Sequence, residues 1–96
     1  MIVKTNWISF HEVIDVINWC VENTPTALLA NCKKSWFSKG LPPISILEVK
    51  NIKEFPYGDS LEGITHFNGD GGFALDVIFN NETDIGLFKK EFEWLL

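Results

Sequence analysis

The chain has 96 residues, the length of one ordinary domain and enough to enclose a single hydrophobic core. Apolar residues make up 46% and charged residues 22%, a globular composition that excludes an intrinsically disordered chain. Thirteen acids oppose eight lysines, arginine is absent, and the net charge is −5. This balance excludes the basic, arginine-bearing face typical of nucleic-acid binders. No run of about 20 apolar residues is present, so a membrane span is excluded as well.

The N-terminal third predicts a short strand over residues 2–8, followed by a helix that ends near Asn23. Ser9 and Glu12 have the spacing of a capping box, in which each side chain bonds the other residue's backbone amide. Apolar residues then recur at helical spacing and define one buried stripe: Phe10, Val13, Ile14, Ile17, Cys20 and Val21. At 100° per residue, Trp19 falls on the opposite side among acids, which makes it the best aromatic candidate for exposure. The alternative is burial under the N-terminal segment or a second helix.

A second helix is predicted over residues 26–38, with Thr24 as its N-cap and Pro25 at its first position. Lys33, Lys34 and Lys39 would then lie near its C-terminal end, where cations suit the helix dipole. Cys20 and Cys32 are too few for a disulfide scaffold, and we expect both to be structural thiols. Positive charges lower the pKa of a nearby thiol, so a reactive Cys32 beside Lys33 and Lys34 remains the alternative.

The second half of the chain is rich in β-formers up to residue 79. Residues 44–52 predict a strand whose alternation slips at Leu47, and residues 63–67 and 73–79 predict a hairpin around a glycine-rich loop, 68–72. A last helix follows Asn80, with a buried stripe of Ile85, Phe88, Phe92 and Leu95 that Leu87 and Trp94 widen. Gly86 weakens this helix and indicates close packing.

The elements predict one α+β domain spanning residues 1–96. It would contain an N-terminal helical pair, a three-stranded antiparallel sheet with the glycine-rich hairpin, and a C-terminal helix packed on the sheet. No catalytic constellation accompanies this fold, and we expect neither an enzyme nor a metal or other cofactor. The glycines at 69–72 lack the following Lys-Ser/Thr of a phosphate loop. A nucleophile–base pair of Cys32 and His66 can be drawn, but no sequence signature supports it.

Charge distribution carries the functional hypothesis. Residues 59–96 hold eight of the thirteen acids and only two lysines, whereas residues 1–58 are nearly neutral. An acidic surface with aromatic anchors is typical of a small protein that docks on a basic protein surface. The residues expected to bind this partner are Trp19, Tyr57, Asp59, Glu62, Asp70, Glu82 and Asp84.

The leading hypothesis is therefore a cytoplasmic inhibitor or regulator of a larger protein, with an anti-defence or immunity-like role and without direct contact to nucleic acid or membrane. The alternative is a module that binds and sequesters a small ligand or nucleotide, which would require a concave pocket with converging polar groups. A third hypothesis is a structural homo-oligomer, whose surplus aromatic residues would form a self-complementary interface.

Residues 73–94 read as a strand, an acidic Asn-Glu-Thr-Asp loop and a helix containing Leu-Phe-Lys. This pattern resembles the C-terminal ends of small accessory proteins encoded by tailed phages. The resemblance implies a host-directed accessory role in the host cytoplasm, and it supplies no catalytic residues.

Overall fold

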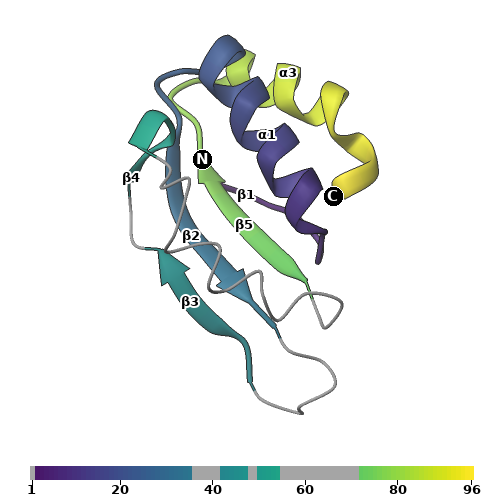
Figure 1. Ribbon diagram of the computed structural model, residues 1–96. Helices are drawn as coiled ribbons and strands as arrows, with labels where there is room; N and C mark the ends of the chain where they lie inside the picture. Colours follow the sequence, from purple (N-terminus) through teal and green to yellow (C-terminus); the bar gives the residue numbers. More distant parts are fainter. Residues whose placement is uncertain (1, 36–41, 48–49, 55–71) are drawn as a thin grey trace.

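An antiparallel sheet with helices on one face forms the framework of the molecule (Figure 1). The computed structural model describes residues 2–35, 42–47, 50–54 and 72–96. Its strands are β1 (Ile2–Lys4), β2 (Leu28–Lys34), β3 (Ile44–Leu47), β4 (Lys50–Asn51) and β5 (Phe73–Ile78). Its α-helices are α1 (Phe10–Asn23) and α3 (Glu82–Glu91), and two 3-10 turns follow β4 and α3: η2 (Ile52–Glu54) and η3 (Glu93–Leu95). The predicted α+β class is confirmed.

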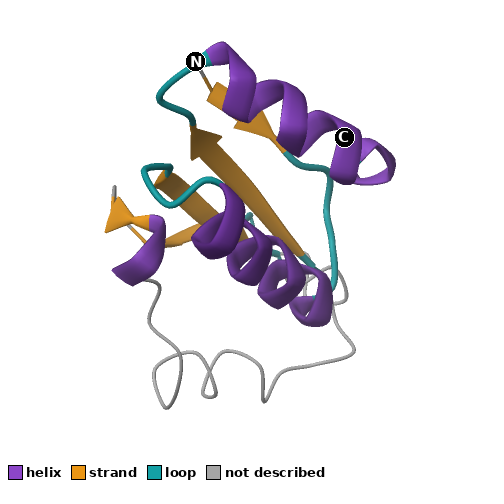
Figure 2. Cartoon of the chain, turned by 90° about the horizontal axis from the view of Figure 1, so that it is seen from above, coloured by secondary structure: helices purple, strands orange, loops and turns teal. Residues whose placement is uncertain are grey.

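The sheet has the strand order β1-β5-β2-β3, and β4 also pairs with β2. All described pairings are antiparallel. On β5 the alternation predicted from sequence holds, because Phe73, Leu75 and Val77 are buried while the residues between them are only partly buried. Figure 2 shows α1 and α3 lying over the same face of the sheet. The buried side chains of β5 belong to one core cluster with residues of both helices.

Helix α1 begins where its sequence signal predicted. The Ser9 backbone N–H donates to Glu12 Oε1 at 2.8 Å, and the Glu12 N–H donates to Ser9 Oγ at 3.2 Å, which confirms the capping box. Three residues of the predicted stripe are buried on α1: Val13, Ile17 and Cys20. Val16 is buried as well, although it was not predicted to belong to the stripe.

The predicted helix over residues 26–38 is wrong, and with it the N-terminal helical pair. Residues 28–34 form strand β2, which pairs with β5 on one side and with β3 and β4 on the other. Thr24 ends α1 instead of starting a new helix, since its backbone N–H donates to Cys20 O at 2.7 Å and its hydroxyl donates to the same carbonyl. Leu, Ala and Lys of this segment are good helix formers, so local propensity favours a helix, and pairing on both sides overrides it.

The predicted three-stranded sheet is also too small, because the described residues contribute five strands. The 44–52 segment splits into β3 and β4 near the position where its alternation slipped. The first hairpin strand, 63–67, and residues 68–71 of the loop lie outside the described residues. Lys33 and Lys34 belong to β2 and not to a helix end. Lys34 is buried, with Nζ 4.7 Å from the centre of the Phe73 ring, a cation–π contact.

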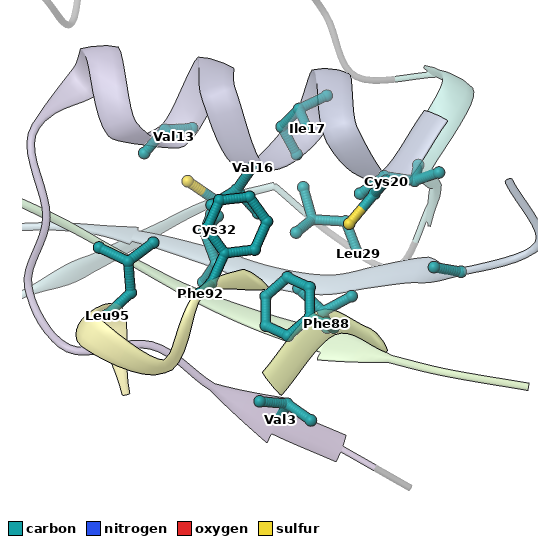
Figure 3. Packing of buried hydrophobic residues seen from close by; sticks show 14 of the residues in the cluster. Val3, Val13, Val16, Ile17, Cys20, Leu29, Cys32, Phe88, Phe92 and Leu95 are labelled. Atoms are coloured by element: carbon teal, nitrogen blue, oxygen red, sulfur yellow. The ribbon is translucent and has the colours of Figure 1, made fainter. Parts of the chain in front are cut away.

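The core lies between the helices and the sheet (Figure 3). Ile17 and Cys20 of α1, Leu29 and Cys32 of β2, and Phe88 of α3 belong to this one buried cluster. The C-terminal helix packs on the sheet as predicted, with Phe88, Phe92 and Leu95 buried. Gly86 does not pack closely, because a Cβ atom built on it would meet nothing within 4 Å.

Candidate protein-binding surface

Helices α1 and α3 are joined by aromatic contacts that decide how Trp19 is placed. Its ring meets those of Phe88 and Phe92 edge-on, with centroid distances of 6.0 and 5.5 Å. Trp19 is therefore only partly exposed, since these rings of the C-terminal region cover it and it packs against the core. The sequence offered exposure or cover by the N-terminal segment or a second helix, and the element that covers Trp19 is instead the C-terminal helix with the residue that follows it.

Charge in the structure is segregated by layer. The described helical elements α1, α3 and η3 carry seven acids and two lysines, a net charge of −5. The described strands and η2 carry five lysines and two acids, a net charge of +3. The acidic surface is thus made by both helices, and α1 belongs to the half of the sequence that appeared neutral.

We give the name acidic face to four acids of the two helices: Asp15 and Glu22 of α1, and Glu82 and Asp84 of the first turn of α3. Asp15, Glu22 and Glu82 are exposed, and Asp84 is partly buried. Asn81 caps α3 by accepting the Asp84 N–H at 2.9 Å, which fixes the first turn where Glu82 and Asp84 lie. Acids in this turn are also favoured by the helix dipole, so their placement stabilises α3.

Of the residues predicted to bind a partner, the structure brings Trp19, Glu82 and Asp84 to the same pair of helices. Asp84 lies close enough to α1 that its charge contributes to raising the pKa of the Cys20 thiol. Tyr57, Asp59, Glu62 and Asp70 lie outside the described residues. Asp15 and Glu22 were not among the predicted residues, and the outward face of the α1 helical wheel was the signal that could have found them.

Two side chains that were expected in the core, one aromatic and one aliphatic, lie on the surface instead. Trp94 is 64% exposed and Leu87 is 47% exposed. The prediction assumed one wide stripe on a helix that continues to the end of the chain, whereas α3 ends at Glu91 with Phe88 as its buried residue. Trp94 lies in the turn η3 that follows. Such exposed large apolar side chains are frequent at protein interfaces.

Both cysteines are buried and poor nucleophiles. Desolvation raises the pKa of Cys20 to about 11, against a hydrogen bond from Thr24 that lowers it. Desolvation also raises the pKa of Cys32 to about 12, so its lysine neighbours in sequence do not activate it. This burial agrees with the prediction that both cysteines are structural thiols and not reactive ones.

Among the described residues, no group of three or more His, Cys, Asp and Glu side chains is arranged to hold a metal ion. Within the same residues, neither helix has the length and apolar character required to cross a bilayer. Comparisons of the chain with protein-family models, with curated proteins and with solved structures found no match.

Proposed function

We propose that this chain is a non-enzymatic protein that binds and inhibits or regulates a larger protein with a basic surface. The observation that carries the proposal is the segregation of charge, because α1, α3 and η3 together have a net charge of −5. A surface lined by one sign of charge steers an oppositely charged partner and raises its association rate. The docking surface would be the acidic face, with the exposed part of Trp19 between its two helices.

The geometry supports this function in a second way. The contacts of Trp19 with Phe88 and Phe92 pack the two helices against each other, so the backbone that carries the acids is already ordered before binding. A preorganised charged surface is what a small inhibitor needs to occlude a site on a larger protein. The resemblance of residues 73–94 to phage accessory proteins adds a host-directed role in the host cytoplasm to the proposal.

The test is to capture a partner from lysate with the immobilised chain, identify it, and measure its affinity for purified variants. Glu22→Lys should weaken binding roughly three- to ten-fold, equal to about 0.7–1.4 kcal/mol, mainly through a slower association rate. Glu54→Lys is the matched control, because it changes the net charge equally but lies in η2, after β4, and is not part of the acidic face.

Binding should also weaken as salt is raised from about 0.05 to 0.5 M, because salt screens exposed charges. If Glu22→Lys and Glu54→Lys weaken binding equally, only net charge matters and the acidic face is not the docking surface. If neither variant nor salt changes the affinity, electrostatic docking is wrong.

A further inference from the structure

The two α-helices carry the same arrangement of acids along the line where they meet. Each helix has two acids that lie seven residues apart, with one large apolar residue between them in the sequence. Seven residues make two helical turns, or about 10.5 Å along the axis. We call these six residues the interhelical seam: Asp15, Trp19 and Glu22 of α1, and Asp84, Leu87 and Glu91 of α3.

Ring contacts show that Trp19 lies on the flank of α1 that faces α3. Its ring centroid is 6.0 Å from that of Phe88 and 5.5 Å from that of Phe92. At 100° per residue, Asp15 lies about 40° and Glu22 about 60° from Trp19, in the direction away from the buried side of α1. Both carboxylates are exposed, so α1 presents them to solvent beside its boundary with α3.

Asp84 identifies the flank of α3 that faces α1. After desolvation, its charge is a further cause of the raised pKa of the Cys20 thiol on α1, which places the two residues near each other. Around the helix, Glu91 lies about 20° and Leu87 about 60° from Asp84. Glu91 is exposed and Leu87 is 47% exposed, so these residues continue the seam on the α3 side.

The other charged residues of α3 leave the seam acidic. Lys89 and Glu82 lie about 140° and 160° from Asp84, on the flank that faces away from α1. Lys90 lies about 60° beyond Leu87 toward solvent. Four carboxylates therefore accompany two apolar side chains, with one lysine at the edge. Acids around an apolar centre are complementary to a partner that has basic residues around an apolar centre.

We infer that the interhelical seam binds a basic amphipathic helix of the partner. The inference rests on the proposed function and names the part of the partner that docks, and it adds Glu91 to the docking surface in place of Glu82. Lysine or arginine side chains seven residues apart on the docked helix repeat at the spacing of the carboxylates, about 10.5 Å. Apolar side chains between them meet Trp19 and Leu87, as when an amphipathic helix lays its apolar face on a hydrophobic surface.

An extended segment does not match the spacing of the carboxylates. Side chains on one face of a strand repeat about every 6.6 Å, and two such repeats cover about 13 Å. The acids of the seam are about 10.5 Å apart on each helix, which falls between these distances. A helix that lies along the seam matches them because it has the same rise per residue, so the favoured occupant is helical.

Isothermal titration of the full chain with a defined peptide tests the inference. The probe is an amphipathic helix of about 21 residues, three repeats of seven, with leucine on one face and lysine on both flanks. The control peptide has the same composition in a shuffled order that breaks the helical period. We expect the probe to bind with a dissociation constant of the order of 10 μM, and the shuffled peptide to bind at least about ten-fold more weakly.

Charge reversal on the two flanks of α3 tests the position of the site. Glu91→Lys should raise the dissociation constant of the probe about five-fold, because it replaces a carboxylate of the seam by a like charge. Glu82→Lys is the matched control, since it makes the same change on the opposite flank of the same helix, and its effect should stay below about two-fold. Leu87→Ala should also weaken binding about five-fold, whereas Ile44→Ala, at a 45% exposed position on β3, should not. Circular dichroism of each variant checks that the helices remain folded.

Four results would overturn the inference: no binding of the probe, equal affinity for the shuffled peptide, equal losses in Glu91→Lys and Glu82→Lys, or no loss in Leu87→Ala. The same variants, measured with the captured partner, separate the inference from the proposed function. If salt and Glu22→Lys weaken the partner's binding but Glu91→Lys and Leu87→Ala do not, the inference fails and the proposed function stands. If neither salt nor Glu22→Lys has an effect, both fail.

Discussion

Phe88 is the residue whose removal best tests how the helical layer is held on the sheet. Its side chain is fully buried, and its ring centroid lies 5.0 Å from that of Phe79, 5.1 Å from Phe92 and 6.0 Å from Trp19. Truncating a core phenylalanine to alanine costs about 3–5 kcal/mol, and a lost aromatic pair adds about 0.5–1.5 kcal/mol. We expect Phe88→Ala to lower the free energy of unfolding by about 4 kcal/mol.

A domain of this kind is stable by only about 5–15 kcal/mol, so Phe88→Ala will be only marginally folded. Phe88→Leu retains most of the volume and should cost about 1–1.5 kcal/mol, which keeps the measurement within range. The assay is urea unfolding followed by tryptophan fluorescence and by circular dichroism, whose transitions should coincide.

Leu87→Ala provides the control for both variants, because Leu87 is the preceding residue of the same helix and is 47% exposed. This change should alter the unfolding free energy by less than about 0.5 kcal/mol. Equal losses for Leu87→Ala and Phe88→Ala would refute the assignment of the buried and exposed stripes on α3. A loss below about 1 kcal/mol for Phe88→Ala would show that α3 does not anchor on this aromatic cluster.

Two further predictions concern backbone freedom and pH. Gly86→Ala should stabilise the chain by about 0.4–1 kcal/mol in urea unfolding, since the position is helical and a Cβ atom meets nothing within 4 Å; destabilisation would reveal close packing there. Burial raises the pKa of Cys20 to about 11 and of Cys32 to about 12, above the ordinary value of 9.0. Above about pH 9 the unfolded thiols therefore lose protons that the folded ones keep, and stability should fall by up to about 1.4 kcal/mol per pH unit and thiol. Cys32→Ala should reduce this slope by the contribution of one thiol, and an unchanged slope would contradict it.

Local signals predicted local structure well. The capping box at Ser9 and Glu12, the alternation of residues 73–79 and the acidic start of the last helix depend on neighbours within four residues. Interactions of this range are visible in a sequence, because the groups that satisfy each other are separated by a known number of bonds. The α+β class followed from these elements.

The prediction of a helix at residues 28–34 failed because their structure depends on residues far away in the sequence. Thr24 and Pro25 are a plausible helix start, but the Thr24 hydroxyl is already used by the Cys20 carbonyl at the end of α1. What makes residues 28–34 a strand is pairing with β5, which begins about forty residues later in the chain. A central strand gains from partners on both sides, and no local pattern contains that information.

The difference between local signals and tertiary packing also explains why the sequence predicted only part of the acidic surface. Counting along the chain assigned the excess acids to residues 59–96, and Glu82, Asp84, Glu91 and Glu93 do belong to that half. Packing then sets α3 against α1, whose outward residues Asp15 and Glu22 are also acidic. The functional property, an acidic helical layer on a more basic sheet, therefore arises from tertiary structure.

The contact of α3 with the core is narrow. Helix α3 buries Phe88, whereas Phe92 and Leu95 are buried beyond its end, and Leu87 of the helix stays exposed. Trp94 lies in the turn η3 after the helix, where its ring centroid is 6.5 Å from that of Phe92 although the side chain is 64% exposed. One side of this indole therefore covers the aromatic cluster while the other meets solvent, which is why a helical stripe drawn through residue 94 could not place it.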